Sequence, residues 1–155
     1  MYLFFYLAGL TVGDPVERTK QPLSVELGPG ILDQIFDGIQ RPLAVIADMS
    51  QSVFVPKGVD VPSLNPKKLW EFKPGNMKVG DILSQGDIFG TVYENSLFSE
   101  HSIMVPPKSQ GKITYIAPAG DYNIHEEVLE LELDGKKSKY SMSHRWPVRQ
   151  SRPIV

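Results

Sequence analysis

The stretch EVLELELDG at residues 127–135 predicts the first strand and the turn of a β-hairpin. Leucines 129, 131 and 133 alternate with Glu130 and Glu132, as in a strand that has one face in water. The dipeptide Asp134-Gly135 favours a type I′ turn, because both of its residues tolerate a positive φ. The second strand is expected within Lys137–Met142.

Further short apolar runs lie upstream of this hairpin, with Gly and Pro between them. Their spacing predicts a small β-barrel or sandwich. The expected strands are residues 23–27, 69–72, 88–93, 102–105 and 111–117, and Val53-Phe54-Val55 is a further candidate. Only one short helix is expected. Glycines 28 and 30 end a strand, Ile31, Leu32, Ile35 and Phe36 follow at helical spacing, and Gly38 and Pro42 stop the helix.

Composition excludes several classes of function. The chain has 155 residues, with 16 Lys and Arg against 18 Asp and Glu, so its charge gives no case for binding nucleic acid or an anionic membrane. It has no cysteine, which excludes a disulfide framework and a thiolate metal site. The apolar run Met1–Leu7 is shorter than the roughly 20 residues that span a bilayer. A buried strand is therefore favoured there over a targeting or membrane segment.

Two Gly-Asp pairs, Gly80-Asp81 and Gly86-Asp87, predict two tight turns. The run from Lys78 to Asp87 resembles the lipoyl/biotinyl carrier fold, a barrel-sandwich hybrid of two short sheets. In carrier domains the modified lysine lies at the tip of an exposed hairpin. Lys78 instead leads directly into Val79-Gly80-Asp81, which matches a scaffold turn, so covalent carrier function is disfavoured.

Four runs resemble the catalytic A subunit of V-type (vacuolar) and archaeal-type rotary ATPases. They are residues 12–16, 22–27, 28–43 and 146–153. The resemblance implies that residues 1–43 form the end of an N-terminal β-barrel with the short helix. Residues 44–147 would form the inserted bulge, or non-homologous region, with a lipoyl/biotinyl-like barrel-sandwich hybrid fold. Residues 148–155 would be a connector towards a nucleotide-binding domain.

The same resemblance implies a function for the parent protein. There, hydrolysis of MgATP drives proton transport, the A subunit works beside the B subunit in the V1 sector on the cytosolic face of vacuolar or endosomal membranes, and the bulge is associated with peripheral stalk subunits. This sequence contains no GxxxxGK[ST] phosphate loop. The segment is therefore expected to be a docking platform that carries out no catalysis and holds no cofactor.

Individual residues add candidates for partner contact. Lys57, Lys67, Lys68 and Lys73 lie in a loop-rich stretch and are candidates for meeting acidic stalk helices, although ordinary solvated lysines are the favoured reading. Arg149 and Arg152 give the connector positive charge, although solvated arginines in a linker are favoured there too. The three histidines, His101, His125 and His144, lack a metal-ligand spacing and are expected at the surface.

Two other readings remain open. The chain could be a free-standing β interaction module or a carrier domain modified on Lys78, and the intact mass of the protein distinguishes the carrier from the platform. The isolated chain could also bind nucleotide, which calorimetry with MgATP tests.

Overall fold

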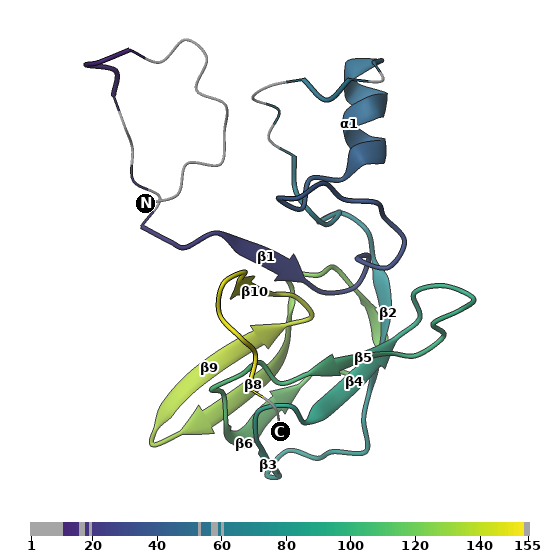
Figure 1. The fold of residues 1–155 in the computed structure, drawn as a ribbon. Helices are drawn as coiled ribbons and strands as arrows, with labels where there is room; N and C mark the ends of the chain where they lie inside the picture. Colours follow the sequence, from purple (N-terminus) through teal and green to yellow (C-terminus); the bar gives the residue numbers. More distant parts are fainter. Residues whose placement is uncertain are drawn as a thin grey trace.

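The structure is a computed structural model that describes residues 11–15, 18, 20–52, 54–56, 59 and 61–153. Within these residues the chain forms ten β-strands and a single α-helix, which confirms the predicted mainly β fold. The strands make two four-stranded sheets and one two-stranded sheet, all antiparallel (Figure 1). The expected strand at Met1–Leu7 and residue Val53 lie outside the described residues, and Phe54 and Val55 are not in a strand.

The first four-stranded sheet has the order β5-β4-β2-β7. Strand β2 (Trp70–Pro74) pairs with β4 (Ile88–Val92) on one side and with β7 (Gly120–Tyr122) on the other. Strand β5 (His101–Met104) pairs with β4 and forms an edge. Three of these strands were predicted, whereas the three-residue strand β7 was not.

The second four-stranded sheet has the order β3-β6-β8-β9. It contains β3 (Ile82–Leu83), β6 (Gly111–Ile116), β8 (Glu127–Leu133) and β9 (Lys136–Ser141). Strands β8 and β9 form the predicted hairpin. At its turn Asp134 has φ 51° and Gly135 has φ 75°, and a type I′ turn requires positive φ at both positions.

The apolar core of the sandwich draws on both sheets. At its centre the Phe72 ring lies 6.2 Å from the Phe89 ring and 6.2 Å from the Tyr122 ring, measured between centroids. The predicted alternation in β8 holds for Leu129 and Leu131, which are buried while Glu130 is only half-buried, but Leu133 beside the turn is exposed and Val128 is also buried. The fully or almost fully buried side chains include Leu64, Trp70, Phe72, Phe89, Val92, Val105, Ile113, Ile124, Val128, Leu129 and Leu131.

A two-stranded sheet joins residues far apart in the sequence. Strand β1 (Ser24–Leu27) pairs with β10 (His144–Pro147), so that Leu27 is opposite His144 and Ser24 is opposite Pro147. Strand β10 was not predicted, since residues 146–153 were interpreted as a linker. The register shows that the start of this run belongs to a sheet.

The predicted helix at residues 31–36 is wrong. Residues 31–33 form a bend and a turn, Phe36 forms an isolated antiparallel β-bridge with Pro42, and the helix α1 spans Leu43–Ser50, beginning directly after Pro42. Ile31 and Phe36 pack against the core while Leu32 and Ile35 are exposed, so the four side chains do not share one buried face. Pro42 does not end a helix. It is the N-cap of α1, a place where its fixed φ and missing N–H are tolerated. In Figure 1, α1 stands apart from the sandwich.

The two Gly-Asp pairs form turns of the same construction, as predicted. Gly80 and Gly86 have φ of 109° and 87°, the conformation that a type II turn requires at its third residue. In the first turn the Lys78 N–H donates to Asp81 Oδ2 at 2.8 Å, and in the second the Ser84 N–H donates to Asp87 Oδ2 at 2.7 Å. Lys78 therefore lies in a scaffold turn.

Candidate functional site

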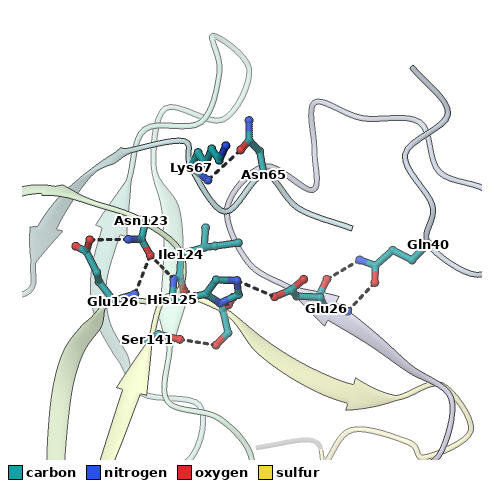
Figure 2. A network of polar contacts seen from close by, with 10 residues as sticks. Glu26, Gln40, Asn65, Lys67, Asn123, Ile124, His125, Glu126 and Ser141 are labelled. Carbon is teal, nitrogen blue, oxygen red and sulfur yellow. Dashed lines mark hydrogen bonds and ion pairs between the residues drawn. The ribbon is translucent and has the colours of Figure 1, made fainter. Parts of the chain in front are cut away.

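The loop at residues 28–42 follows β1. The side chain of Gln40 in this loop forms hydrogen bonds with the backbone of β1. Gln40 Nε2 donates to the Glu26 carbonyl at 2.5 Å, and the Glu26 N–H donates to Gln40 Oε1 at 2.6 Å (Figure 2). The carboxamide thus satisfies both backbone groups of Glu26, as a neighbouring strand would. Gln40 is itself buried, so this pair of bonds is shielded from water.

Asp37 gives the same loop its turn conformation. Its Oδ1 accepts the N–H groups of Ile39 at 3.0 Å and Arg41 at 2.8 Å, and its Oδ2 accepts Arg41 Nε at 2.7 Å. Burial would raise the pKa of Asp37, but the bonds from Arg41 and Ile39 outweigh it and hold the pKa below its ordinary value. An aspartate that bonds nearby backbone groups in this way favours a turn over a helix at residues 37–41.

A buried carboxylate anchors the loop to the sandwich. The side chain of Glu94 is fully buried, and its Oε1 accepts the N–H groups of Gly30 at 2.7 Å and Leu32 at 3.0 Å. Its Oε2 contacts Nδ1 of His101, the first residue of β5. The neighbouring Asn95 Nδ2 donates to Asp33 Oδ1 at 2.8 Å. The segment between β4 and β5 therefore fixes residues 30–33 from across the fold.

The approach of this loop to the sandwich is close enough to require a glycine. Gly30 has φ 98°, and a Cβ placed on it would lie 3.1 Å from Cζ2 of Trp70. Trp70 is 3% exposed, and its indole Nε1 has no hydrogen-bond partner among the residues that the structure describes. Backbone at Gly30 therefore packs directly on the indole ring, where any side chain would have to displace it.

A second polar network connects β1 to the turn at residues 123–126, which lies between β7 and β8 (Figure 2). Nε2 of His125 lies 3.9 Å from Oε1 of Glu26, and the His125 N–H donates to Asn123 Oδ1 at 2.9 Å. The Ser143 hydroxyl donates to the Ile124 carbonyl at 3.1 Å. The turn at residues 123–126 thereby meets both β1 and the corner before β10.

Three of the four lysines predicted to contact a partner lie in the described part of the chain, and two of these three interact with neighbouring side chains. Lys57 lies outside the described residues, and Lys67 is exposed in the loop before β2. The Lys68 ammonium lies 4.0 Å from the centroid of the Trp70 ring, where a cation–π interaction holds it. Lys73 Nζ lies 3.3 Å from Oε1 of Glu71 on the same strand. Contact with a partner stays a prediction for these residues.

The two predicted arginines differ in their surroundings. Arg149 is exposed in the turn after β10. Arg152 Nη1 lies 2.9 Å from His144 Nε2, and its guanidinium lies 5.3 Å from the Trp146 ring centroid. Arg152 is exposed, but its guanidinium lies against β10, and contact with a partner stays a prediction for both arginines.

Two of the three histidines are less exposed than predicted, and the third is exposed as predicted. His101 is half-buried against Glu94, and His144 is half-buried beside Arg152, whereas His125 is exposed. Burial, and then the charge of Arg152, lower the pKa of His144 below its ordinary value. A neutral His144 is the form that accepts a hydrogen bond from Arg152.

Glu94 and Gln40 are the residues that sequence reasoning missed. A signal for Glu94 exists, because Gly90, Val92 and Glu94 form one period-two series, which places Glu94 on the same side of the chain as buried Gly90 and Val92, two residues beyond the end of β4. An acidic residue on a buried face needs partners, and Gly30, Leu32 and His101 supply them. Gln40 has no comparable signal in the sequence.

The requirements of a metal site, a membrane span and a binding depression are met to different degrees by the described residues. Among the described residues, no three His, Cys, Asp or Glu side chains gather in a way that could hold a metal ion. In the same part of the chain, no helix is long and apolar enough to cross a membrane. A depression of about 430 Å³ lies between residues 32–35 and 95–97, and another of about 200 Å³ is lined in part by Gly86, Val105 and Arg152.

Comparison with known proteins places this fold in a family. Residues 61–149 match the barrel-sandwich domain of ATP synthase alpha/beta subunits. The match covers the two four-stranded sheets and β10, which agrees with the predicted barrel-sandwich hybrid. The chain belongs to the family of ATP synthase alpha/beta subunits that carry this domain.

The relatives that match most of this chain share one name within the family. Over 148 residues, 96% of this chain, it is 59% identical to the catalytic A subunit of the V-type proton ATPase of Eremothecium gossypii. The identity is 58% to the protein of that name from Candida albicans and 57% to the one from Hordeum vulgare, again over 96% of the chain. The match covers 24% to 25% of those relatives, so the chain spans about a quarter of their length. The predicted resemblance to catalytic A subunits is confirmed.

Proposed function

We propose that this chain is part of the catalytic A subunit of a V-type ATPase, where it serves as a rigid docking platform. The observation that carries the proposal is 59% identity over 96% of the chain to such a protein. By this proposal the whole protein hydrolyses MgATP to drive proton transport, next to the B subunit and the peripheral stalks, on the cytosolic face of vacuolar or endosomal membranes. The residues that perform hydrolysis lie outside this segment, which has no GxxxxGK[ST] motif.

The physical properties of the segment support a mechanical role. A platform that resists torque must hold its side chains in fixed positions, and elements of regular structure do this better than loops. The sandwich has one continuous apolar core, and the loop at 28–42 is fastened to it by Glu94 and Asn95. Relative motion between the loop and the sandwich therefore requires breaking buried bonds.

The test of the platform is a charge reversal at the predicted lysines. We change Lys67, Lys68 and Lys73 to Glu in the whole protein and measure the affinity of purified peripheral stalk at two salt concentrations. If these lysines meet acidic stalk helices, the affinity falls about tenfold or more and loses much of its salt dependence. The matched control changes Lys78, Lys108 and Lys112, which are also exposed, to Glu. Equal effects of both triple variants, or none from the first, would contradict the platform contact.

Two measurements distinguish the platform from the two alternatives, a nucleotide-binding chain and a carrier domain modified on Lys78. Calorimetry of the isolated chain with MgATP is expected to show no heat of binding, and micromolar affinity would overturn the proposal that nucleotide binds elsewhere. The intact mass of the protein from its source is expected to equal the mass of the unmodified chain. A lipoyl or biotinyl adduct on Lys78 would make the carrier reading correct.

A further inference from the structure

Three large aliphatic side chains are exposed at the shallow depression between residues 32–35 and 95–97. Leu32, Ile35 and Leu97 are 47%, 76% and 85% exposed, which is unusual for large aliphatic side chains that lie close together. The lining residues of the depression are Leu32, Asp33, Gln34, Ile35, Asn95, Ser96 and Leu97.

Both walls of this depression are fixed in place. Glu94 holds the wall at residues 30–32 through two hydrogen bonds, and Asn95 Nδ2 ties Asp33 to the opposite wall. Asn95 Oδ1 also accepts the N–H groups of Leu97 at 3.0 Å and Phe98 at 2.8 Å, which holds the second wall in its turn. An exposed apolar surface that is ordered before binding loses little conformational entropy when a partner arrives.

The side chains that line the depression include one carboxylate, that of Asp33, and no Lys or Arg. Arg41, close by in the sequence, pairs with Asp37 at 2.7 Å. Glu100 is exposed three residues after Leu97. A surface of this kind attracts cations and repels anions. A second copy of the same face would bring Asp33 against another Asp33, so charge disfavours self-association here.

We propose that this depression binds a basic segment of another polypeptide, which inserts one apolar side chain between Leu32, Ile35 and Leu97 while its lysines or arginines lie near Asp33 and Glu100. The proposal goes beyond the platform function, since it requires neither a stalk contact nor Lys67, Lys68 and Lys73. The occupant has the opposite charge to the acidic helices expected at those lysines. The two surfaces therefore select different partners.

The first test is photo-cross-linking in the whole natural protein. Leu97→p-benzoylphenylalanine places a photoreactive group at the rim, and Ile82→p-benzoylphenylalanine on β3, 80% exposed, is the matched control. We expect position 97 to cross-link an apolar residue of a different polypeptide, with at least two Lys or Arg within about five positions of it, as charge complementarity requires. Position 82 should not cross-link that segment.

Each other outcome overturns the proposal. A cross-link to the same polypeptide would make the depression a surface between parts of one protein, and a cross-link to a second copy would make it a self-association surface. A partner segment without basic residues would remove the electrostatic argument. The absence of any cross-link above that of position 82 would show that the surface stays unoccupied.

The second test isolates the charge. Asp33→Asn keeps an oxygen that can accept the bond from Asn95 but removes the carboxylate charge. At low salt we expect the cross-linking yield at position 97 to fall about three- to tenfold, and the yield of the unchanged protein to fall similarly as salt is raised. Asp121→Asn, at an exposed position on β7, is the control and should leave the yield unchanged. An equal yield in both variants would contradict the role of Asp33.

Discussion

The sandwich is stabilised mainly by apolar packing, whereas the loop at residues 28–42 is stabilised mainly by hydrogen bonds from polar side chains. The sandwich is held by apolar side chains on alternating strand positions, with Phe72 and Phe89 at its centre. The loop has no strand or helix, and Gln40, Asp37 and Glu94 satisfy its backbone groups. A well-defined conformation can therefore rest on a few polar side chains, each of which is then harder to replace than its neighbours.

The strongest effect of a single substitution is expected in the core of the sandwich. Phe72→Ala removes a fully buried ring that packs against Phe89 and Tyr122, and we expect the free energy of unfolding to fall by about 3–5 kcal/mol. Urea unfolding followed by circular dichroism measures this loss. Tyr115→Ala, at a half-exposed position on β6, should cost less than about 1 kcal/mol. Similar costs for both would mean that the core does not dominate stability.

A smaller and more local effect is expected at Glu94. Glu94→Ala leaves the N–H groups of Gly30 and Leu32 without their acceptor, a loss of about 1.5–3 kcal/mol for hydrogen bonds to a charged group. Hydrogen exchange should accelerate at Gly30 and Leu32 and stay slow at Leu131. Glu94→Gln keeps an acceptor oxygen, so its exchange rates should lie between those of Glu94→Ala and the unchanged protein. Uniform acceleration throughout the sandwich would show that the loop and the core are one cooperative unit.

Gly30→Ala tests the contact between the two regions. An L-residue at φ 98° is strained, and its Cβ would lie 3.1 Å from Trp70, so we expect a loss of about 1–3 kcal/mol. The emission of Trp70 should shift, measured with Trp146 replaced by Phe. Gly38→Ala is the control, because its φ is not positive and its Cβ would meet no atom within 4 Å. A cost at Gly38 equal to that at Gly30 would rule out the close approach as the cause.

The smallest expected effect is a loss of stability at His144 when the pH is lowered. Because the folded-state pKa of His144 lies below its ordinary value of 6.5, the unfolded chain binds the proton more readily. The contribution of His144 to stability is therefore fully present above pH 6.5 and declines as the pH falls through the folded-state pKa. Fluorescence of Trp146, measured with Trp70 replaced by Phe, should report loosening of Arg152 in this range. His144→Gln should abolish the change, and its persistence would assign it to another group.

A strand could be predicted where its own residues, or an adjacent turn, carry a recognisable sequence pattern. Strands β1, β2, β4, β5, β6 and β8 carry apolar alternation or apolar runs between turn residues, which are visible in the sequence, and β9 was predicted as the partner of β8 across the Asp134-Gly135 turn. Strands β3, β7 and β10 are two to four residues long, and pairing with a distant strand defines them. Such strands have no periodicity to detect.

The mainly β fold, the type I′ hairpin, the Gly-Asp turns and the family resemblance were all predictable, because each depends on residues close together along the chain. The conformation of residues 28–42 and the start of α1 at Leu43 emerged only once the chain was folded. The reason is distance along the chain, since Gln40 bonds a residue 14 positions away and Glu94 bonds one 64 positions away. Polar bonds over such separations leave no local pattern, yet they overrule the helical spacing of Ile31, Leu32, Ile35 and Phe36.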